Sequence, residues 1–270
     1  MDASKSQTQI RNNSLPYHVF HLESWEGFLE LVTSAPYSNW AFRGQSDESW
    51  PLFSALSRYF HSFKINPGDW AGRERRMLRI FKRKAHHFLS HIPDPDDDFE
   101  WLALMQHHGS PTRLLDFTWS PYVAAFFAVE KATSNSAVWA LNPAMGGEYG
   151  LREKGSYESY FLSGQTSFVS IEEPYIMNRR LIAQSGTFAV PSTLNEPLES
   201  ILSGYKDPSN TLAKFILSRD RVRDEGMREL YRMNITHATL FPDLDGLARS
   251  GVNPIGWTVT GLKLECPWGR

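Results

Sequence analysis

Apolar side chains recur at three- and four-residue intervals along much of the chain, which is the spacing of an amphipathic helix. Residues 22–32 follow this spacing, and Ser24 is placed to cap the helix that it predicts. The same spacing predicts helices over residues 72–90, 99–107, 122–133 and 221–233. Pro121 stands in the first turn of the helix over 122–133, where a missing N–H is tolerated.

Shorter apolar runs bounded by turn-forming residues predict strands. They lie at residues 39–43, 137–141, 186–190, 211–218 and 256–264. Residues 110–121 are predicted to form a loop between two helices, and the polar, glycine-rich residues 142–170 a mobile loop region. Helices precede and interrupt the strands without a repeat or an interdomain linker. The pattern therefore predicts one α+β domain over residues 17–270, preceded by a flexible tail over residues 1–16.

Composition narrows the class of protein. The chain has 270 residues, of which 41% are hydrophobic and 21% charged, and these fractions exclude a disordered, collagen-like or coiled-coil protein. The single cysteine, Cys266, excludes an internal disulfide and a multi-cysteine zinc site. The N-terminal residues are polar and the apolar runs are short, so we expect a cytoplasmic protein with no membrane partner. A net charge of −2 does not by itself indicate nucleic-acid binding.

The first candidate site is Phe42-Arg43-Gly44-Gln45, at the end of a predicted strand. An arginine there presents a planar donor fork, which suits the two oxygens of a phosphate or carboxylate. The alternative is an internal ion pair that holds the strand end.

Two later segments carry further polar chemistry. Residues 106–118 combine hydroxyl groups, imidazoles, one arginine and one aspartate, and in this segment Arg113 and Asp116 either bind a ligand or pair with each other. The adjacent imidazoles of His107 and His108 would diverge by about 100° on a helix, so we expect no metal site. In the second segment Gln184 precedes a predicted strand, where it either faces a cleft or forms a tight turn.

The predicted helix over residues 72–90 is strongly basic. Seven cationic residues lie between Arg73 and Lys84, interrupted by the single acid Glu74. Such a stretch is either a solvated helix face or a surface that binds the phosphates of a nucleic acid. The residues predicted to bind nucleic acid are Arg75, Arg76, Arg79, Lys82 and Arg83. The usual sequence motifs of kinases, dehydrogenases, α/β-hydrolases and zincins are absent, which argues against those classes.

Four ordered blocks of sequence resemble the FRG-domain family. The first is the Phe-Arg-Gly of residues 42–44, and the second is QHHGSPTRLLDFTWSPYVAAFFA at residues 106–128. RLIAQSGTF at residues 180–188 and TLFPDLDGLA at residues 239–248 resemble its later blocks. The resemblance spans roughly residues 20–250 and implies that residues 17–270 form an FRG-type catalytic domain. The family is distantly similar to ADP-ribosyltransferases, which implies a mixed sheet core decorated by helices.

The resemblance also implies a set of site residues for NAD as co-substrate, without a metal. The catalytic residues would be Arg43, Thr112, Asp116 and Gln184. The NAD-binding residues would be Arg43, Gly44, Gln45, His108, Ser110, Arg113, Tyr122 and Phe188. The catalytic glutamate that ADP-ribosyltransferases carry in their third motif is missing from residues 183–187. Asp116 is the candidate replacement, with Glu172 and Glu173 in reserve.

These observations lead to one leading function and two alternatives. We expect an NAD-dependent ADP-ribosyltransferase toxin of a toxin–antitoxin or anti-phage defence system, acting on nucleic acid and above all on single-stranded RNA. Its partners would be an antitoxin and a chaperone. The first alternative is a non-enzymatic ligand-sensing or protein-binding module. The second is a metal-independent ribonuclease in which His107 or His108 is the acid and base, since histidine titrates near neutrality.

Overall fold

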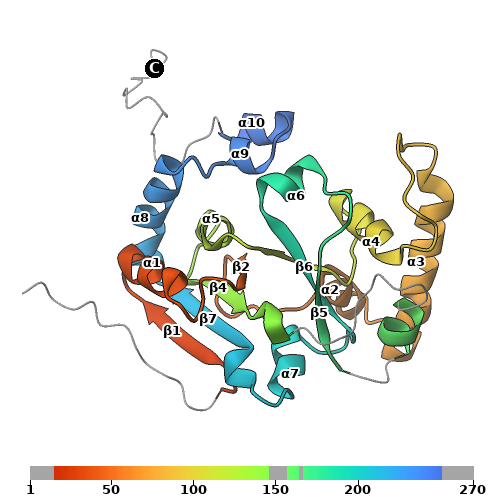
Figure 1. The fold of residues 1–270 in the computed structure, drawn as a ribbon, viewed down its shortest axis with the longest axis horizontal. Coiled ribbons are helices and arrows are strands. Elements are labelled where there is room, and N and C mark those ends of the chain that lie inside the picture. The colour runs from red at the N-terminus through yellow and green to blue at the C-terminus, as the bar shows by residue number, and fades with distance from the viewer. Residues whose placement is uncertain (1–14, 146–156, 164–166, 251–270) are drawn as a thin grey trace, which may run out of the picture.

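A mixed sheet of seven strands forms the centre of this computed structural model, which describes residues 15–145, 157–163 and 167–250 (Figure 1). The strands lie in the order β1-β7-β4-β2-β3-β6-β5, and only β1 and β7 run parallel. Their bounds are β1 His18–Leu22, β2 Ala41–Gln45, β3 Leu115–Thr118, β4 Ser136–Leu141, β5 Val169–Glu172, β6 Gly186–Pro191 and β7 Leu212–Leu217. The predicted α+β class is confirmed.

Ten α-helices and four helical turns of other types, three 3₁₀ and one π, surround the sheet in the described residues. The α-helices are α1 Trp25–Thr33, α2 Ala55–Ser62, α3 Trp70–Ala85, α4 Asp98–His107, α5 Pro121–Val129, α6 Arg179–Ala183, α7 Leu198–Ser203, α8 Arg219–Arg232, α9 His237–Leu240 and α10 Leu244–Ser250. The turns are η1 Pro67–Asp69, η2 Pro143–Met145, η3 Tyr157–Leu162 and η4 Pro208–Asn210. In Figure 1, α3 and α4 lie beyond the β5–β6 end of the sheet, far from α1 and α8.

The sheet is divided between β2 and β3. These two strands are joined by a single residue pair, Phe42 with Thr118. By contrast, β2 pairs with β4 through five residues, and β3 pairs with β6 through four. The strands of one part, β1-β7-β4-β2, therefore separate from β3-β6-β5 beyond this pair, and the separation leaves room for side chains between the two parts.

Helix α5 packs directly on one face of β2 and β4, and Gly44 permits this close approach. A Cβ atom at residue 44 would lie 2.0 Å from the Ala124 carbonyl oxygen and 2.6 Å from the Ala128 nitrogen, both in the α5 backbone. The core on this face joins α1, α5 and α8 through aromatic rings such as Phe28, Phe126 and Phe215. Any side chain larger than hydrogen at residue 44 would therefore push α5 away from the sheet.

Two further clusters complete the interior. On the opposite face of the sheet, Trp139 and Leu115 pack with residues of α7. At the β5–β6 end, α3 and α4 pack on β6 through residues such as Phe99 and Phe188. This second cluster fixes the position of α4, which supplies part of the candidate site below.

The structure confirms most of the predicted helices and strands and corrects several. The segment 110–121 was predicted to be a loop, which is wrong for residues 115–118, because β3 forms there with one exposed aspartate between buried neighbours. The predicted helix over residues 72–90 ends at Ala85. The segment 142–170 contains η3 and the start of β5. Strand β1 and helices α2 and α7 were not predicted at all. The predicted strand 256–264 and most of the tail 1–16 lie outside the described residues.

Candidate functional site

Arg43 lies where β2 and β3 separate. Its Nη1 atom donates a hydrogen bond of 2.6 Å to the Asp116 carbonyl oxygen, so the side chain bridges the two strands where the backbone pairing has ended. The Nε atom is buried and has no hydrogen-bond partner in the described part of the chain. A buried N–H without a partner is costly, and a ligand oxygen would satisfy it.

The Asp116 side chain is exposed and held from one side. Gln106 of α4 donates an amide hydrogen to Asp116 Oδ1 at 2.8 Å, and the Thr112 hydroxyl donates in turn to Gln106 Oε1. Thr112 is 1% exposed and also accepts the Leu114 N–H. This buried hydroxyl positions Gln106, and the predicted catalytic role of Thr112 stays a prediction.

Two cavities meet at Gln106 and Asp116. The first, which we call the arginine cavity, has a volume of about 230 Å³ and also contains Arg43, Arg58 and Ser110 in its walls. The second, which we call the glutamine cavity, has about 70 Å³. It is lined by Ala103, Gln106, His107, Asp116, Asn178, Arg180, Leu181, Gln184 and Phe188. The Asp116 carboxylate thus lies between a cationic recess and a mainly uncharged one.

The electrostatics of the two cavities differ. Burial lowers the pKa of Arg43, the Asp116 carboxylate opposes this effect, and the charge of Arg58 adds to it. In the glutamine cavity, burial lowers the pKa of His107, and the neighbouring His108 and Arg180 lower it further. His107 is therefore a neutral imidazole at pH 7, because its ordinary pKa of about 6.5 is already below that pH.

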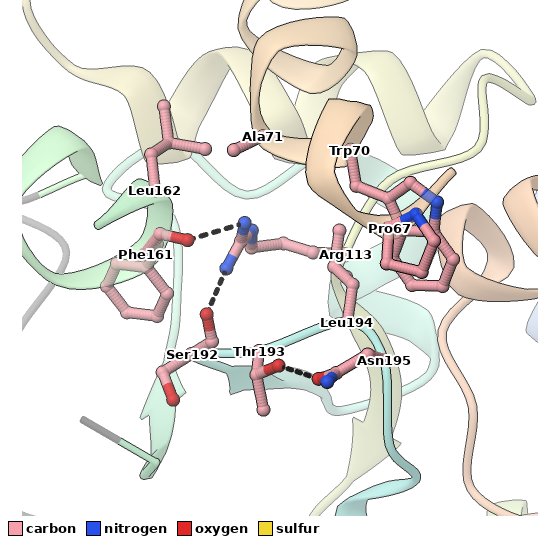
Figure 2. Close-up of a pocket in the computed structure, with 10 residues that line it drawn as sticks. All are labelled: Pro67, Trp70, Ala71, Arg113, Phe161, Leu162, Ser192, Thr193, Leu194 and Asn195. Atoms are coloured by element: carbon pink, nitrogen blue, oxygen red, sulfur yellow. Dashed lines mark hydrogen bonds between the residues drawn. The ribbon is translucent and has the colours of Figure 1, made fainter. Parts of the chain in front are cut away.

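Arg113 does not belong to this site. It is 1% exposed and forms a bidentate ion pair with Glu74 of α3, with distances of 2.8 and 2.5 Å. Its remaining donors bond the carbonyl oxygens of Phe161, Ser192 and Pro191, and Figure 2 shows the guanidinium pointing between the first two. Arg113 therefore does not pair with Asp116, which was one of the two alternatives for this segment. Every donor of its guanidinium is used inside the protein, so none is left for the predicted contact with NAD.

A separate cavity of about 240 Å³ adjoins this arginine (Figure 2). The pKa of Arg113 is raised, because the attraction and hydrogen bonds of Glu74 outweigh the lowering effect of burial. Arg113 thus ties the loop before β3 to α3, η3 and the end of β6, and its role is structural.

Gly44 and Gln45 were predicted to bind NAD, and the structure gives both residues other roles. Gly44 faces the α5 backbone. Gln45 is 7% exposed, accepts the Trp139 indole N–H at 2.7 Å and donates to the Pro51 carbonyl oxygen at 3.3 Å. Both ends of its amide are therefore engaged on the face of the sheet that carries Trp139.

The other predicted residues are only partly brought together. Ser110 lines the arginine cavity, while Gln184 and Phe188 line the glutamine cavity. The Gln184 amide donates one hydrogen bond to the Leu240 carbonyl oxygen at 3.0 Å, and its catalytic role stays a prediction. His108 is exposed at the end of α4, and Tyr122 packs against the α5 core, and neither lines these two cavities. The reserve acids Glu172 and Glu173 are absent from both linings as well.

The predicted basic helix is α3, and some of its charged side chains have ion-pair partners while others have none among the described residues. Glu74, its single acid, turns inward to Arg113. Arg75 pairs with Glu158 at 2.8 Å, and Lys82 pairs with Asp98 at 2.6 Å. The exposed residues Arg76, Arg79 and Arg83 have no partner among the described residues.

Sequence reasoning missed Arg58 and did not assign a role to Gln106. Arg58 lies on α2, which was not predicted, and nothing in the spacing of its neighbours links it to Arg43. Gln106 lies in the second block of the resemblance, but its partners Thr112 and Asp116 can be identified only when β3 is known to be a strand. In the part of the chain that the structure describes, no helix is long and apolar enough to cross a bilayer, and no three potential metal-binding side chains cluster.

Comparison with known proteins supports one family. Residues 38–137 of the 270 match the model of the FRG domain. The match includes Arg43, Gln106 and Asp116, and with them the first two blocks of the resemblance. The blocks at residues 180–188 and 239–248 lie outside it. No curated protein and no solved structure matches the chain.

Proposed function

We propose that this protein is an NAD-dependent ADP-ribosyltransferase. The observation that carries the proposal is the exposed Asp116 carboxylate between the two cavities, next to the partly unsatisfied guanidinium of Arg43. A bipartite ligand with its reactive bond near the middle fits this arrangement. The order of the parts also agrees with the resemblance, since the arginine lies on an early strand and Asp116 on the strand before α5.

The chemistry assigned to the site is heterolysis of the nicotinamide–ribose bond. The C–N bond breaks, its electron pair leaves with nicotinamide, and C1 of the ribose bonds to an acceptor atom whose proton passes to solvent. Positive charge develops on the ribose in the transition state. The Asp116 carboxylate, oriented by Gln106, would stabilise that charge, and Arg43 would hold the anionic part of the co-substrate.

Asp116→Asn should slow nicotinamide release by about 100-fold, because the amide keeps the size of the carboxylate but not its charge. The assay follows free nicotinamide from NAD labelled in the nicotinamide ring, using the full chain. Asp69→Asn is the matched control, since Asp69 is exposed at the end of η1, makes no side-chain cap hydrogen bond to α3 and lines neither cavity. Equal rates in wild type and Asp116→Asn would overturn the catalytic assignment.

Other outcomes of that assay favour the alternatives. NAD binding without nicotinamide release by the folded protein would favour a ligand-sensing module. RNA cleavage without NAD would favour a ribonuclease, for which the neutral imidazole of His107 is a suitable base.

The acceptor proposed is nucleic acid, in particular single-stranded RNA. Arg76, Arg79 and Arg83 are spaced three and four residues apart, so they lie along one side of α3 at intervals of about 5–6 Å. Unpaired arginines at this spacing suit successive phosphates of a strand. A toxin with this activity would need a neutralising antitoxin, with a chaperone as a further proposed partner, and it would act in the cytoplasm, within a toxin–antitoxin or anti-phage system.

Replacing all three arginines by glutamine should weaken RNA binding and reduce its salt dependence. Removing three phosphate contacts lowers the slope of log K against log salt by about 2 for a single strand. The measurement is fluorescence anisotropy with a labelled RNA oligonucleotide between 50 and 200 mM salt. Arg219, Arg221 and Arg228 changed to glutamine on α8 remove the same charge elsewhere. An equal loss in both triple variants would show that only net charge matters.

A further inference from the structure

A second guanidinium faces the candidate site beside Arg43. Arg58 of α2 lines the arginine cavity, and its Nη1 atom donates to the Phe53 carbonyl oxygen at 2.5 Å. Phe53 lies five residues earlier, so this bond draws the side chain back across the start of its own helix. The position of the charge is thereby fixed near the cavity mouth.

Two like charges held at one cavity repel each other. Arg58 acts on Arg43 in this way, and the lowered pKa of Arg43 reflects it together with burial. The start of α2, at Ser54 and Ala55, lines the same cavity and adds the positive end of a helix dipole. Asp116 is the only acid in the lining, and one of its oxygens is bonded to Gln106.

The buried Nε of Arg43 gives an independent sign of a ligand. It has no hydrogen-bond partner among the described residues, and Arg43 lines a cavity of about 230 Å³. An anion in this cavity would accept that N–H and separate the two guanidinium groups electrostatically. Both effects lower the free energy of the bound form relative to the empty one.

We propose that the arginine cavity is an anion site in which Arg58 and Arg43 together hold a diphosphate group. The inference deepens the proposed transferase and rests on it for NAD as the natural carrier of the diphosphate. The existence of the anion site depends only on the geometry of the cavity. Arg58 would then contribute the ligand-binding arginine that the resemblance had implied at Arg113.

Arg58→Gln should weaken the binding of ADP by about 10- to 100-fold, since a charge-assisted hydrogen bond and a full positive charge are lost. The measurement is isothermal titration of the full chain with ADP and, separately, with adenosine. Adenosine has no phosphate, so its affinity should be the same in wild type and variant. Arg228→Gln on α8 is the control, because this exposed arginine lines none of the cavities described.

The results separate this inference from the proposed reaction. ADP affinity that depends on Arg58, in a protein that releases no nicotinamide, would support the anion site and reject the transferase. Nicotinamide release with unchanged ADP affinity in Arg58→Gln would support the transferase and overturn the role of Arg58. Equal losses for ADP and adenosine would assign Arg58 a structural role and overturn the inference, as would wild-type protein that does not bind ADP.

Discussion

Glu74→Ala is expected to lower the free energy of unfolding by about 3–5 kcal/mol, because it leaves the buried Arg113 charge without its partner. Both side chains are at most 2% exposed, so water cannot replace the lost carboxylate. Urea denaturation followed by circular dichroism measures the change, and the slope of the transition should stay the same. A loss below about 1 kcal/mol would contradict the importance of this pair.

The same helix offers a matched comparison. Arg75, the residue after Glu74, pairs with Glu158, but these side chains are 53% and 61% exposed. Glu158→Ala should therefore cost less than about 1 kcal/mol. Replacing Glu74 and Arg113 together by methionine should recover only part of the stability, since the carbonyl oxygens that Arg113 bonds would then lose their donors.

Gly44→Ala is expected to lower the free energy of unfolding by about 3 kcal/mol or more, which is the upper end of the usual cost of overpacking. The added methyl group would meet backbone atoms of α5 at 2.0 and 2.6 Å, and a helix backbone cannot rotate away as a side chain can. The expected result is a lower urea midpoint together with weaker ADP binding, because β2 also carries Arg43.

Gly72→Ala is the control for this substitution. Gly72 lies on the exposed side of α3, and a Cβ atom there would meet nothing within 4 Å. Alanine in place of glycine inside a helix should raise stability by roughly 0.5–1 kcal/mol. If Gly44→Ala were as stable as wild type, the close packing of α5 on β2 would be refuted.

The sequence was sufficient to predict the elements whose apolar spacing is regular. Helices α1, α4, α5 and α8 and strands β2, β4, β6 and β7 were found within a few residues of their bounds. Strand β3 was missed because only four residues form it and an exposed aspartate interrupts them. Strand β1 was missed because it pairs with a strand almost 200 residues away, and no local pattern reports such a pairing.

Only part of the candidate site could be predicted from the sequence. Arg43 was singled out as an arginine at the end of a predicted strand and Asp116 as the carboxylate of the segment 106–118, and the structure brings the two residues together. Arg113 had the same local appearance, but its partner Glu74 lies on a helix 39 residues earlier. Arg58 lacked any local sign. Tertiary packing decides which arginine lines a cavity and which is buried in an ion pair, and spacing along the chain does not encode that packing.

The segment that matches the FRG domain is not an independent folding unit. Residues 38–137 contain β2 and β3 but only the first two residues of β4, and they lack β6 and β7. Within this segment β2 and β3 share one residue pair. The remaining partners of these strands come from later in the chain, so the geometry of Arg43 and Asp116 depends on residues outside the matched range.

The pairing of β1 with β7 implies a delay during translation between the synthesis of β1 and that of its partner strand. His18 pairs with Ala213, so 195 residues must follow His18 out of the ribosome before its partner exists. At about 5–20 residues per second, this interval is roughly 10–40 s. Throughout that time the apolar strand of residues 18–22 emerges without its neighbour. The nascent chain therefore exposes this apolar strand during the interval, and this edge of the sheet can form only after the residues of β7 have been synthesised.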